Sequence, residues 1–598
     1  MLQKTKLFIA LGIAACLFSA CKEDNTLAVS DARLNLDTTP IAAVKNGMLT
    51  EVDIDAVGPW QTSSNKDWIK VSPSWGINDG AISITITKNR TDETRNGLIT
   101  VSIGEEIVKT IAVNQQAGVL VPVGERNFYV TTTGQIANDG TDWELPTTLD
   151  AALDEAVSGE VIHIAAGTYT PGIHLTGASG ATGGAVNGDK TFEIKQNITL
   201  IGGYPAGAQE GAVADPAANP TILSGELSTG NAYHVVSVTA LKEEGKKVHL
   251  KGLTITKGVA HTANDAWSVN GVSYRRSYGA GFYIAQARVE LEDCIVSENR
   301  LPASTPGGGI FCRNSTELTL RNCRIEKNSG ALEGSSGVGI ALEASTLTAY
   351  NTTFFKNEAG GNGATILAST GPVTAYLYNC TFNENKTGMT GWGSRPGSAW
   401  YGWANTVCTM VNCTLFGNLG TPTASSGGGG SGGAIALHDG GKANLVSCTV
   451  TGNLATHTNG GGGYFYNSGN PRQLNLYNTV FSGNVSRFNE ANQDVSSPPS
   501  VKKNSIVGST VYDSGEGALA GATFVPGTML GTLGDNGGRT QTIPLIGMSN
   551  PATTGGMSAA ELSALATTLS INAEGATYLP VDQRGQTRTD RKMGACNQ

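Results

Sequence analysis

The sequence predicts an all-β protein in which a small immunoglobulin-like β-sandwich is followed by a right-handed parallel β-helix solenoid with an N-terminal helical cap. Three observations predict this fold. Glycine supplies 79 of the 598 residues, about twice its usual share of roughly 7%. Residues 34–117 alternate apolar and polar side chains in short runs, as half-buried strands do. Residues 293–484 repeat a pattern of asparagine and cysteine at intervals of 28 to 35 residues, which is typical of a solenoid.

Composition and charge exclude several classes of protein. Hydrophobic residues make up 39% of the chain, and the glycines show no three-residue period. The chain is therefore neither disordered nor collagen-like. The 49 acidic residues outnumber the 40 Lys and Arg residues, which gives a net charge of −9. A negative chain has no general electrostatic attraction to nucleic acid or anionic lipid. No nucleic-acid partner is expected.

The N-terminus has the layout of a secretory signal, because Lys4 and Lys6 precede an apolar stretch at 7–18 that is too short to cross a bilayer. The run 18–21, Phe-Ser-Ala-Cys, resembles a lipoprotein signal-peptidase site, and the run 22–25, Lys-Glu-Asp-Asn, resembles the export tag of Bacteroidetes surface lipoproteins. The resemblance implies a diacylated Cys21 and an outer-membrane protein that faces the cell exterior and contacts the membrane through its lipid only.

Two alternatives to lipidation at Cys21 stay open. Cys16 follows Ile13-Ala14-Ala15, which fits the local pattern of a lipoprotein site slightly better. An ordinary cleaved signal with a fortuitous cysteine is the other alternative.

The first domain is predicted from alternating runs such as 81–86 and 98–103, which Gly, Asn and Asp turns separate. The segments 68–73, 95–97 and 113–117, with the turn at Asn89, resemble the BACON domain of Bacteroidetes surface proteins. The resemblance implies a module that binds carbohydrate or mucin or acts as a spacer. Trp60 and Trp75 lie beside turn residues and are candidates for stacking on a sugar ring, whereas Trp68 is expected in the core.

The repeat stacks seven pairs of residues, and an asparagine stands five residues after each pair. Such a repeat, with a glycine-led apolar strand before most pairs, predicts a parallel β-helix rather than a β-propeller. Asparagine suits left-handed turns, and stacked asparagines form a hydrogen-bonded ladder at ~4.8 Å spacing. The pairs are 293–294, 322–323, 351–352, 379–380, 412–413, 447–448 and 478–479, and the following asparagines are Asn299, Asn328, Asn357, Asn385, Asn418, Asn453 and Asn484.

The cysteines of the repeat are predicted to pack in the core. One repeat position holds either Cys or Thr, and the chain has no CxxC pair, so a buried stack of mostly free thiols is favoured over a metal site. The residues at this position are Cys294, Cys323, Thr352, Cys380, Cys413, Cys448 and Thr479.

Both ends of the solenoid are expected to be covered. Residues 126–169, with an amphipathic helix from Thr148 to Val157, resemble the opening cap of bacterial secreted β-helix proteins. Asp139 and Asp142 offer a weak possibility of a structural calcium ion, although plain turn chemistry is favoured, and no other cofactor is predicted. Residues 533–538, 551–552, 582–585 and 593–595 resemble a choice-of-anchor Q module, which implies a C-terminal cap.

These inferences give one division of the chain. It consists of a lipoprotein signal peptide at 1–20, a lipidated tether at 21–33, the BACON-like sandwich at 34–117, a linker at 118–125, the β-helix with its cap at 126–526 and the C-terminal module at 527–598.

No motif identifies a reaction. Many β-helices of the pectin-lyase-like fold are polysaccharide lyases or glycoside hydrolases, but this chain lacks the Asn-Thr-Asp, Asp-pair and Gly-His-Gly elements of polygalacturonase-like hydrolases. The rungs show no acidic cluster for calcium. Arg275, Arg276 and Arg395 are the only suggestive bases for a lyase, and each is expected to be a solvated loop charge.

Aromatic loop residues are the remaining candidates for a glycan site. They lie beside hydrogen-bonding Asn and Arg residues, as sugar stacking requires, although Tyr401 stands where other rungs place a core strand. We predict a monomeric surface lipoprotein that binds polysaccharide or host glycan, or mediates adhesion, without catalysis. A polysaccharide lyase or glycoside hydrolase is the alternative, and a structural spacer is the third. The candidate residues are Trp392, Arg395, Tyr401, Trp403, Trp267 and Tyr274.

Overall fold

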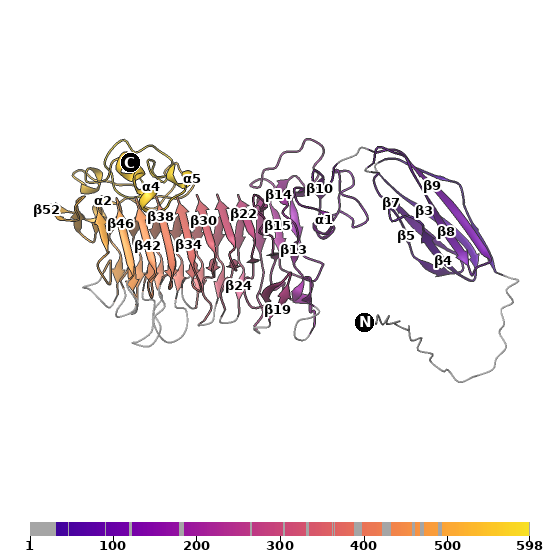
Figure 1. Ribbon diagram of the computed structural model, residues 1–598, viewed down its shortest axis with the longest axis horizontal. Coiled ribbons are helices and arrows are strands. Elements are labelled where there is room, and N and C mark those ends of the chain that lie inside the picture. The colour runs from indigo at the N-terminus through magenta and orange to yellow at the C-terminus, as the bar shows by residue number, and fades with distance from the viewer. Residues whose placement is uncertain are drawn as a thin grey trace, which may run out of the picture. The chain divides into compact units, whose positions relative to one another are not determined.

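The computed structural model separates the chain into two compact units, residues 1–121 and 122–598, and each is considered by itself (Figure 1). The residues that the structure describes are 32–45, 47–89, 91–118, 122–178, 184–262, 266–302, 305–330, 334–360, 363, 365–387, 397–420, 432–456, 461–466, 472–487 and 493–596. Within these ranges no helix is long and apolar enough to cross a bilayer.

The first unit is a β-sandwich of a four-stranded and a five-stranded sheet, in the orders β1-β3-β7-β5 and β2-β9-β8-β4-β6. Alternation along the strands turns every second side chain inward, so Ile82, Ile84 and Ile86 of one strand join the core. The strands are β1 (Arg33–Leu36), β2 (Ile41–Ala43), β3 (Met48–Val57), β4 (Pro59–Ser64), β5 (Ile69–Ser72), β6 (Trp75–Ile77), β7 (Gly80–Ile86), β8 (Arg95–Ile103) and β9 (Ile107–Gln115).

The second unit is a β-helix whose coils stack into long parallel sheets. The 12-stranded sheet contains, in order, β10 (Asn127–Val130), β11 (Val161–Ala165), β14 (Thr199–Tyr204), β17 (Val248–Lys251), β22 (Arg288–Glu292), β26 (Glu317–Arg321), β30 (Thr346–Tyr350), β34 (Val373–Tyr378), β38 (Thr406–Val411), β42 (Lys442–Val446), β46 (Gln473–Tyr477) and β49 (Val501–Lys503).

The next two sheets complete the wall of the coil. The 13-stranded sheet contains β12 (Gly167–Tyr169), β15 (Thr221–Ser224), β18 (Leu253–Thr256), β23 (Ile295–Ser297), β27 (Arg324–Glu326), β31 (Thr353–Phe355), β35 (Thr381–Asn383), β39 (Thr414–Phe416), β43 (Thr449–Thr451), β47 (Val480–Phe481), β50 (Ile506–Val507), β51 (Thr510–Tyr512) and β52 (Ala518–Thr523). The nine-stranded sheet contains β13 (Phe192–Ile194), β16 (Val236–Thr239), β21 (Phe282–Ala285), β25 (Ile310–Arg313), β29 (Ile340–Leu342), β33 (Ile366–Ala368), β37 (Trp400–Gly402), β41 (Ile435–Leu437) and β45 (Tyr464–Tyr466).

Two smaller elements accompany these sheets. The two-residue strands β24 (Arg300–Leu301), β28 (Ser329–Gly330), β32 (Glu358–Ala359), β36 (Lys386–Thr387), β40 (Leu419–Gly420), β44 (Leu454–Ala455) and β48 (Val485–Ser486) form a seven-stranded sheet. The hairpin of β19 (Ala266–Val269) and β20 (Val272–Arg275) is antiparallel.

Each coil turns twice through left-handed backbone, at positions that the repeat fixes. The first member of each repeat pair has φ between 48° and 55°, which lets one residue carry the chain from the 12-stranded to the 13-stranded sheet. The residue before each following asparagine also has positive φ and is Glu, Lys or Gly, as Glu298, Lys327 and Gly417 illustrate. Asparagine and glycine tolerate this conformation best, which explains their frequency.

The second asparagine column forms a continuous buried ladder, as the sequence predicts. Asn357 Nδ2 donates to Asn385 Oδ1 (3.0 Å) in the next rung, and Asn357 Oδ1 accepts from Asn328 Nδ2 (3.1 Å) in the previous one. Each of the seven ladder asparagines is at most 2% exposed. The ladder ends where Asn484 Nδ2 donates to Asp494 Oδ1 (2.7 Å).

The cysteine column is a stack of buried free thiols, which confirms the prediction from the repeat. Each thiol donates to a backbone carbonyl of the previous rung, for example Cys323 Sγ to Leu291 O (3.2 Å) and Cys413 Sγ to Leu377 O (3.4 Å). Thr479 Oγ1 makes the same contact with Leu445 O (3.1 Å). A shared donor and a similar size explain why Cys and Thr interchange at this position.

The N-terminal cap contains the expected helix, α1 (Leu149–Glu155). Thr148 caps it by accepting from Ala151 N, and Leu149, Ala152 and Leu153 are buried in the solenoid core. The turn that precedes the helix uses Asp139 and Asp142 as acceptors. Asp139 Oδ1 accepts from Thr141 N (3.1 Å), and Asp142 Oδ1 accepts from Leu145 N (2.9 Å).

The C-terminal segment, residues 526–596, folds back along the side of the solenoid over β30 to β46 (Figure 1). Thr540 Oγ1 donates to Asn379 O (2.8 Å), and Asn412 Nδ2 donates to Tyr578 O (2.7 Å). The buried Arg588 donates to Asn412 Oδ1 (3.2 Å). The helices in this segment are α2 (Pro526–Met529), α3 (Ala559–Ser563), α4 (Leu565–Thr568) and α5 (Ala573–Ala576), with a 3₁₀ turn at Pro551–Thr553. A second 3₁₀ turn, at Asn187–Asp189, lies in the N-terminal rungs.

Breaking the ladder should destabilise the solenoid strongly. Asn357→Ala removes the acceptor of Asn328 N and Asn328 Nδ2 and the side-chain donor to Ile325 O, while Asn385 Oδ1 keeps the backbone N–H of residue 357 as a donor. Each buried group that loses its partner costs about 1–3 kcal/mol, so we expect the free energy of unfolding to fall by at least about 2 kcal/mol. Urea unfolding followed by circular dichroism measures this. The exposed neighbour Lys356→Gln is the control, and equal midpoints for both variants would show that the ladder is dispensable.

Candidate functional site

The outer face of the 12-stranded sheet carries two columns of side chains that the strand register aligns from rung to rung. The first column runs through Asn127, Val161, Thr199, His249, Glu290, Thr319, Thr348, Tyr376, Thr409, Asn444 and Asn475. The second runs through Tyr129, His163, Ile201, Lys251, Glu292, Arg321, Tyr350, Tyr378, Val411, Val446 and Tyr477.

The C-terminal segment covers the far half of this face. From β38 onward every member of both columns is buried. The second column packs here against apolar side chains of the C-terminal segment. The column members are Tyr350, Tyr378, Val411, Val446 and Tyr477, and the residues that cover them are Met557, Leu562, Leu565, Leu569, Ile571 and Leu579. Over β10 to β26 most column members remain partly exposed. We call this uncovered part, from Tyr129 to Arg321, the open strip.

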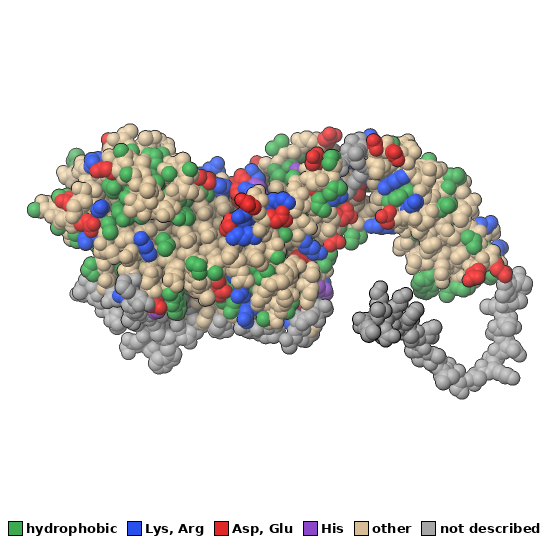
Figure 2. All heavy atoms as spheres, in the orientation of Figure 1, with side chains coloured by type: hydrophobic (Ala, Val, Ile, Leu, Met, Phe, Trp, Pro, Cys, Tyr) green, Lys and Arg blue, Asp and Glu red, His purple; other side chains and the backbone are tan. Residues whose placement is uncertain are grey.

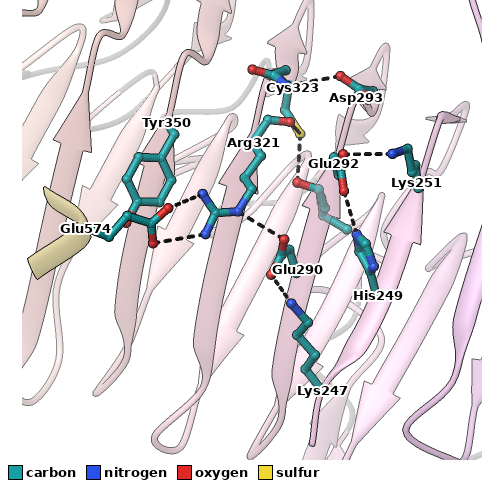
Figure 3. A network of polar contacts seen from close by, with 12 residues as sticks. Lys247, His249, Lys251, Glu290, Glu292, Asp293, Arg321, Cys323, Tyr350 and Glu574 are labelled. Carbon is teal, nitrogen blue, oxygen red and sulfur yellow. Dashed lines mark hydrogen bonds and ion pairs between the residues drawn. The ribbon is translucent and has the colours of Figure 1, made fainter. Parts of the chain in front are cut away.

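An ionic cluster occupies the C-terminal end of the open strip (Figure 3). Lys251 Nζ donates to Glu292 Oε1 (2.8 Å), and His249 Nε2 lies 3.1 Å from Glu292 Oε2. Lys247 pairs with Glu290, whose other oxygen accepts from Arg321 Nε (3.0 Å). In Figure 2 blue and red side chains gather at this level, between the raised C-terminal segment and the raised loops of the first rungs.

The electrostatics of the cluster favour its charged forms. The hydrogen bond from Lys251 to Glu292 raises the pKa of Lys251. Burial raises the pKa of Glu292, but the hydrogen bond and charge of Lys251 and the contact with His249 outweigh it, so this pKa lies below its ordinary value. Both groups therefore keep their charges at neutral pH.

His249, Glu290 and Glu292 also place one ligand atom each within 4.8 Å of one another, so they are a possible metal-ligand set. Imidazole and carboxylate groups suit several divalent ions. Lys247, Lys251 and Arg321 already supply positive charge to the same carboxylates. Both carboxylates of this set are thus already paired with cations of the protein.

An aromatic cluster lies at the N-terminal end of the open strip. The rings of Tyr129 and His163 stack with their centroids 5.0 Å apart, and the ring of Trp143 lies 4.8 Å from Tyr129 and 5.3 Å from Tyr204. His163 Nδ1 lies 2.8 Å from Tyr204 Oη, and its Nε2 lies 2.9 Å from Asn127 Oδ1. All four rings are partly exposed. Burial lowers the pKa of His163, so the imidazole is neutral at neutral pH.

The two clusters are neighbours. Lys251 is close enough to Tyr204 for each to affect the pKa of the other. In register, His163 and Arg321 are four strand spacings apart, which corresponds to about 19 Å at ~4.8 Å per strand. The open strip is therefore a rigid surface with rings at one end and fixed charges at the other.

Several residues that the sequence suggested for glycan binding are buried, and these expectations are corrected. Trp60 is 2% exposed in the core of the sandwich, where its indole donates to Asn78 O (2.7 Å). Tyr274 is fully buried and bonds to Ser237 Oγ (2.6 Å), and Tyr401 is 2% exposed. Arg276, expected to be a solvated loop charge, is instead buried in an ion pair with Asp189 (2.7 Å). A ring inside the apolar core cannot stack on a sugar.

Of the other suggested residues, those that the structure describes are not members of the open strip. Trp75 is 61% exposed on β6, an edge strand of the sandwich, and Ile77 beside it is 60% exposed. Trp403 is 39% exposed and packs on His438, with ring centroids 4.7 Å apart. Trp267 is partly buried against Tyr274. Trp392 and Arg395 lie outside the described residues.

Sequence reasoning missed the ionic cluster, because it searched the rungs only for an acidic cluster that could bind calcium. His249, Glu290 and Arg321 come from three different coils, and each stands in an ordinary polar–apolar–polar strand. Aligning the His-Leu-Lys, Glu-Leu-Glu and Thr-Leu-Arg strands with the repeat would have placed their polar residues in adjacent columns.

Comparison with protein families identifies two parts of the chain. Residues 58–116 match the BACON family, described as a putative N-terminal binding domain, and residues 245–402 match the right-handed β-helix region. The chain thus contains a BACON domain followed by a right-handed β-helix. No curated protein matches it.

Similar solved structures include a pectate lyase, Pel9A, at 14% identity and a TM-score of 0.35, with 66% of this chain and 82% of the lyase covered. A Bacteroides ovatus GH5 xyloglucanase in complex with a XXXG heptasaccharide matches at 14% identity and a TM-score of 0.14, over 28% of this chain and 45% of its own length. The periplasmic chaperone SfaE matches at 12% identity and a TM-score of 0.13, over 16% of this chain and 66% of its own. This chain thus spans less than half of the xyloglucanase.

The charge state of the cluster predicts how stability depends on pH. The folded pKa of Glu292 lies below the ordinary value of 4.5, so its stabilising contribution is complete above that pH and is lost as pH falls through the folded pKa. We expect Glu292→Gln to lower the melting temperature near pH 7, with the difference from the parent protein shrinking towards about pH 3. The control is Glu155→Gln, an exposed residue of α1. A difference that stays constant with pH would contradict this prediction.

Proposed function

We propose that this protein binds glycan through the open strip, without catalysis, as a lipid-anchored protein of the outer membrane that faces the cell exterior. The single observation that carries the binding proposal is the open strip itself. It places four partly exposed rings and a set of hydrogen-bonding charged groups on one rigid face, and the C-terminal segment leaves only this half uncovered.

The chemistry of the open strip suits sugars. Aromatic faces pack against the C–H groups of a sugar ring, while fixed donors and acceptors bind its hydroxyl groups. Tyr129, Trp143 and Tyr204 supply the rings. The rigid parallel sheet holds donors and acceptors at regular intervals, so little conformational entropy is lost on binding.

Binding without catalysis is favoured by the state of the charged groups. Glycoside hydrolysis needs a carboxylic acid with a raised pKa beside a carboxylate, and elimination needs a free base. Here the pKa of Glu292 is lowered and that of Lys251 is raised, which is the wrong direction for a general acid and a general base. Catalysis remains the second candidate, because His249, Glu290 and Glu292 converge within 4.8 Å.

The BACON domain supports a role in binding as well. Its edge strand β6 exposes Trp75 and Ile77 on the same face, which forms a small apolar surface. We propose this surface as a separate, weaker glycan contact of the BACON domain.

Affinity gels with variants that each replace one tryptophan by alanine test where glycan binds. The soluble chain from Lys22 is run through gels that contain plant, host or mucin glycans. We expect Trp143→Ala to weaken retardation about twofold to tenfold, because an aromatic contact contributes about 0.5–1.5 kcal/mol. Trp75→Ala should have a smaller effect. Trp403→Ala, a half-exposed aromatic away from the open strip, is the matched control, and circular dichroism verifies folding.

Each other outcome points to a different function. Equal weakening by Trp403→Ala would move the site to the loop that carries Trp403. A cleared zone in the glycan would identify an enzyme. The absence of both retardation and clearing across the panel would favour the structural spacer.

The lipid anchor has its own test. We expect the full chain, produced in a Gram-negative host, to incorporate labelled palmitate and to sediment with the outer membrane. Cys21→Ser should abolish both properties, because the Cys21 thiol carries the lipid, whose acyl chains add about 0.8 kcal/mol of membrane affinity per buried methylene. Cys16→Ser is the control. Loss of label with Cys16→Ser instead would place the anchor at that residue.

A further inference from the structure

We propose that the outer edge of the Arg321 guanidinium is a carboxylate-binding subsite for an acidic sugar, and that Glu574 of the C-terminal segment occupies this subsite until a ligand carboxylate displaces it. The inference rests on the proposed glycan binding at the open strip and names its ligand class, a glycan that contains uronate or another carboxylate sugar.

Arg321 presents its two edges to two different carboxylates (Figure 3). Its Nε donates to Glu290 Oε1 (3.0 Å) on the neighbouring strand. Its Nη1 donates to Glu574 Oε1 (2.6 Å) and its Nη2 to Glu574 Oε2 (3.2 Å). The second contact is the bidentate fork by which arginine recognises planar carboxylates.

Tyr350 fixes the orientation of the fork. The guanidinium carbon lies 4.4 Å from the centroid of the Tyr350 ring, which itself stacks on Tyr378 with centroids 5.1 Å apart. Tyr350 is 2% exposed, so the platform cannot move freely. Together with Glu290, this platform holds the guanidinium in place whether or not Glu574 is bound.

Glu574 is the replaceable partner. Glu290 is mostly buried and shares Lys247 as a second cation, so it belongs to the framework of the sheet. Glu574 comes from the four-residue helix α5, and its side chain is 49% exposed. The side chains of Arg321 and Glu574 are 30% and 49% exposed, so water reaches the Glu574 side of the pair. A ligand carboxylate that makes the same two hydrogen bonds can therefore replace Glu574, and the released Glu574 is hydrated.

The position of this subsite suits a polymer. Arg321 is the last column member before the face is buried beneath the C-terminal segment. A chain that stacks on the aromatic cluster must extend about 19 Å along the open strip to reach it, at ~4.8 Å per strand. The ligand is thus an oligosaccharide with a carboxylate several sugars away from its stacked ring.

The test compares a uronate oligosaccharide with its carboxyl-reduced counterpart, which has the same sugars without the charge. Binding of both to the soluble chain from Lys22 is measured by titration calorimetry. We expect Glu574→Gln to tighten binding of the uronate about threefold to tenfold and to leave the reduced ligand unchanged, because the competing carboxylate is gone. Arg321→Lys should weaken binding of the uronate about tenfold, because an ammonium group cannot form the fork.

Two controls separate this inference from the proposed function. Glu561→Gln removes another exposed carboxylate of the C-terminal segment, one that pairs with Arg591 (2.7 Å) away from the open strip, and it should change neither affinity. Trp143→Ala should weaken both ligands about equally, because stacking does not depend on the charge. Circular dichroism and the melting temperature establish that each variant folds.

The outcomes are distinct. If Trp143→Ala weakens binding while Glu574→Gln and Arg321→Lys leave the preference for the uronate unchanged, the subsite is wrong and the proposed function stands. If Glu574→Gln weakens binding of the uronate, Glu574 contacts the ligand and is no competitor. Tighter binding of poly-glutamate than of the uronate would reassign the fork to an acidic peptide. Failure of both sugars to bind would overturn the inference and the proposed function together.

Discussion

Hydrogen bonds between the buried asparagines of successive coils fix the register on which the rest of the β-helix depends. Asn328, Asn357 and Asn385 each bond to the next rung, so a slip of one residue would leave buried amides without partners. With the register set, every other repeat position becomes a column. The thiol stack and, from β22 onward, the two outer columns of the 12-stranded sheet follow from this constraint.

The polarity of the side chains in these columns determines which part of the sheet face is buried by the C-terminal segment. From Tyr350 onward the second outer column is aromatic or aliphatic for five rungs, and the C-terminal segment buries it with Leu562, Leu569 and Ile571. Towards the N-terminus the same column holds Lys251, Glu292 and Arg321, which are better left in water or paired with one another. The open strip is where the apolar part of the column ends.

The charged groups of the open strip are paired with one another. Lys251 and Glu292 stabilise each other's ionised forms, so neither titrates near neutral pH. Fixed charges on a rigid sheet bind polar ligands without reorganisation. The bidentate contact between Arg321 and Glu574 shows that the strip holds a carboxylate of the chain itself at the border of the C-terminal segment.

The sequence by itself determined the repeat, the asparagine ladder, the cysteine column and the capping helix α1, because each depends on local backbone geometry or on residues that recur once per coil. Only the tertiary structure decided which aromatic residues are exposed. Trp60 is buried although it lies beside turn residues, as the exposed Trp75 does. It also brought Arg321 to Glu574, 253 residues away. Burial and ion pairing depend on what packs above a residue, and local sequence does not contain that information.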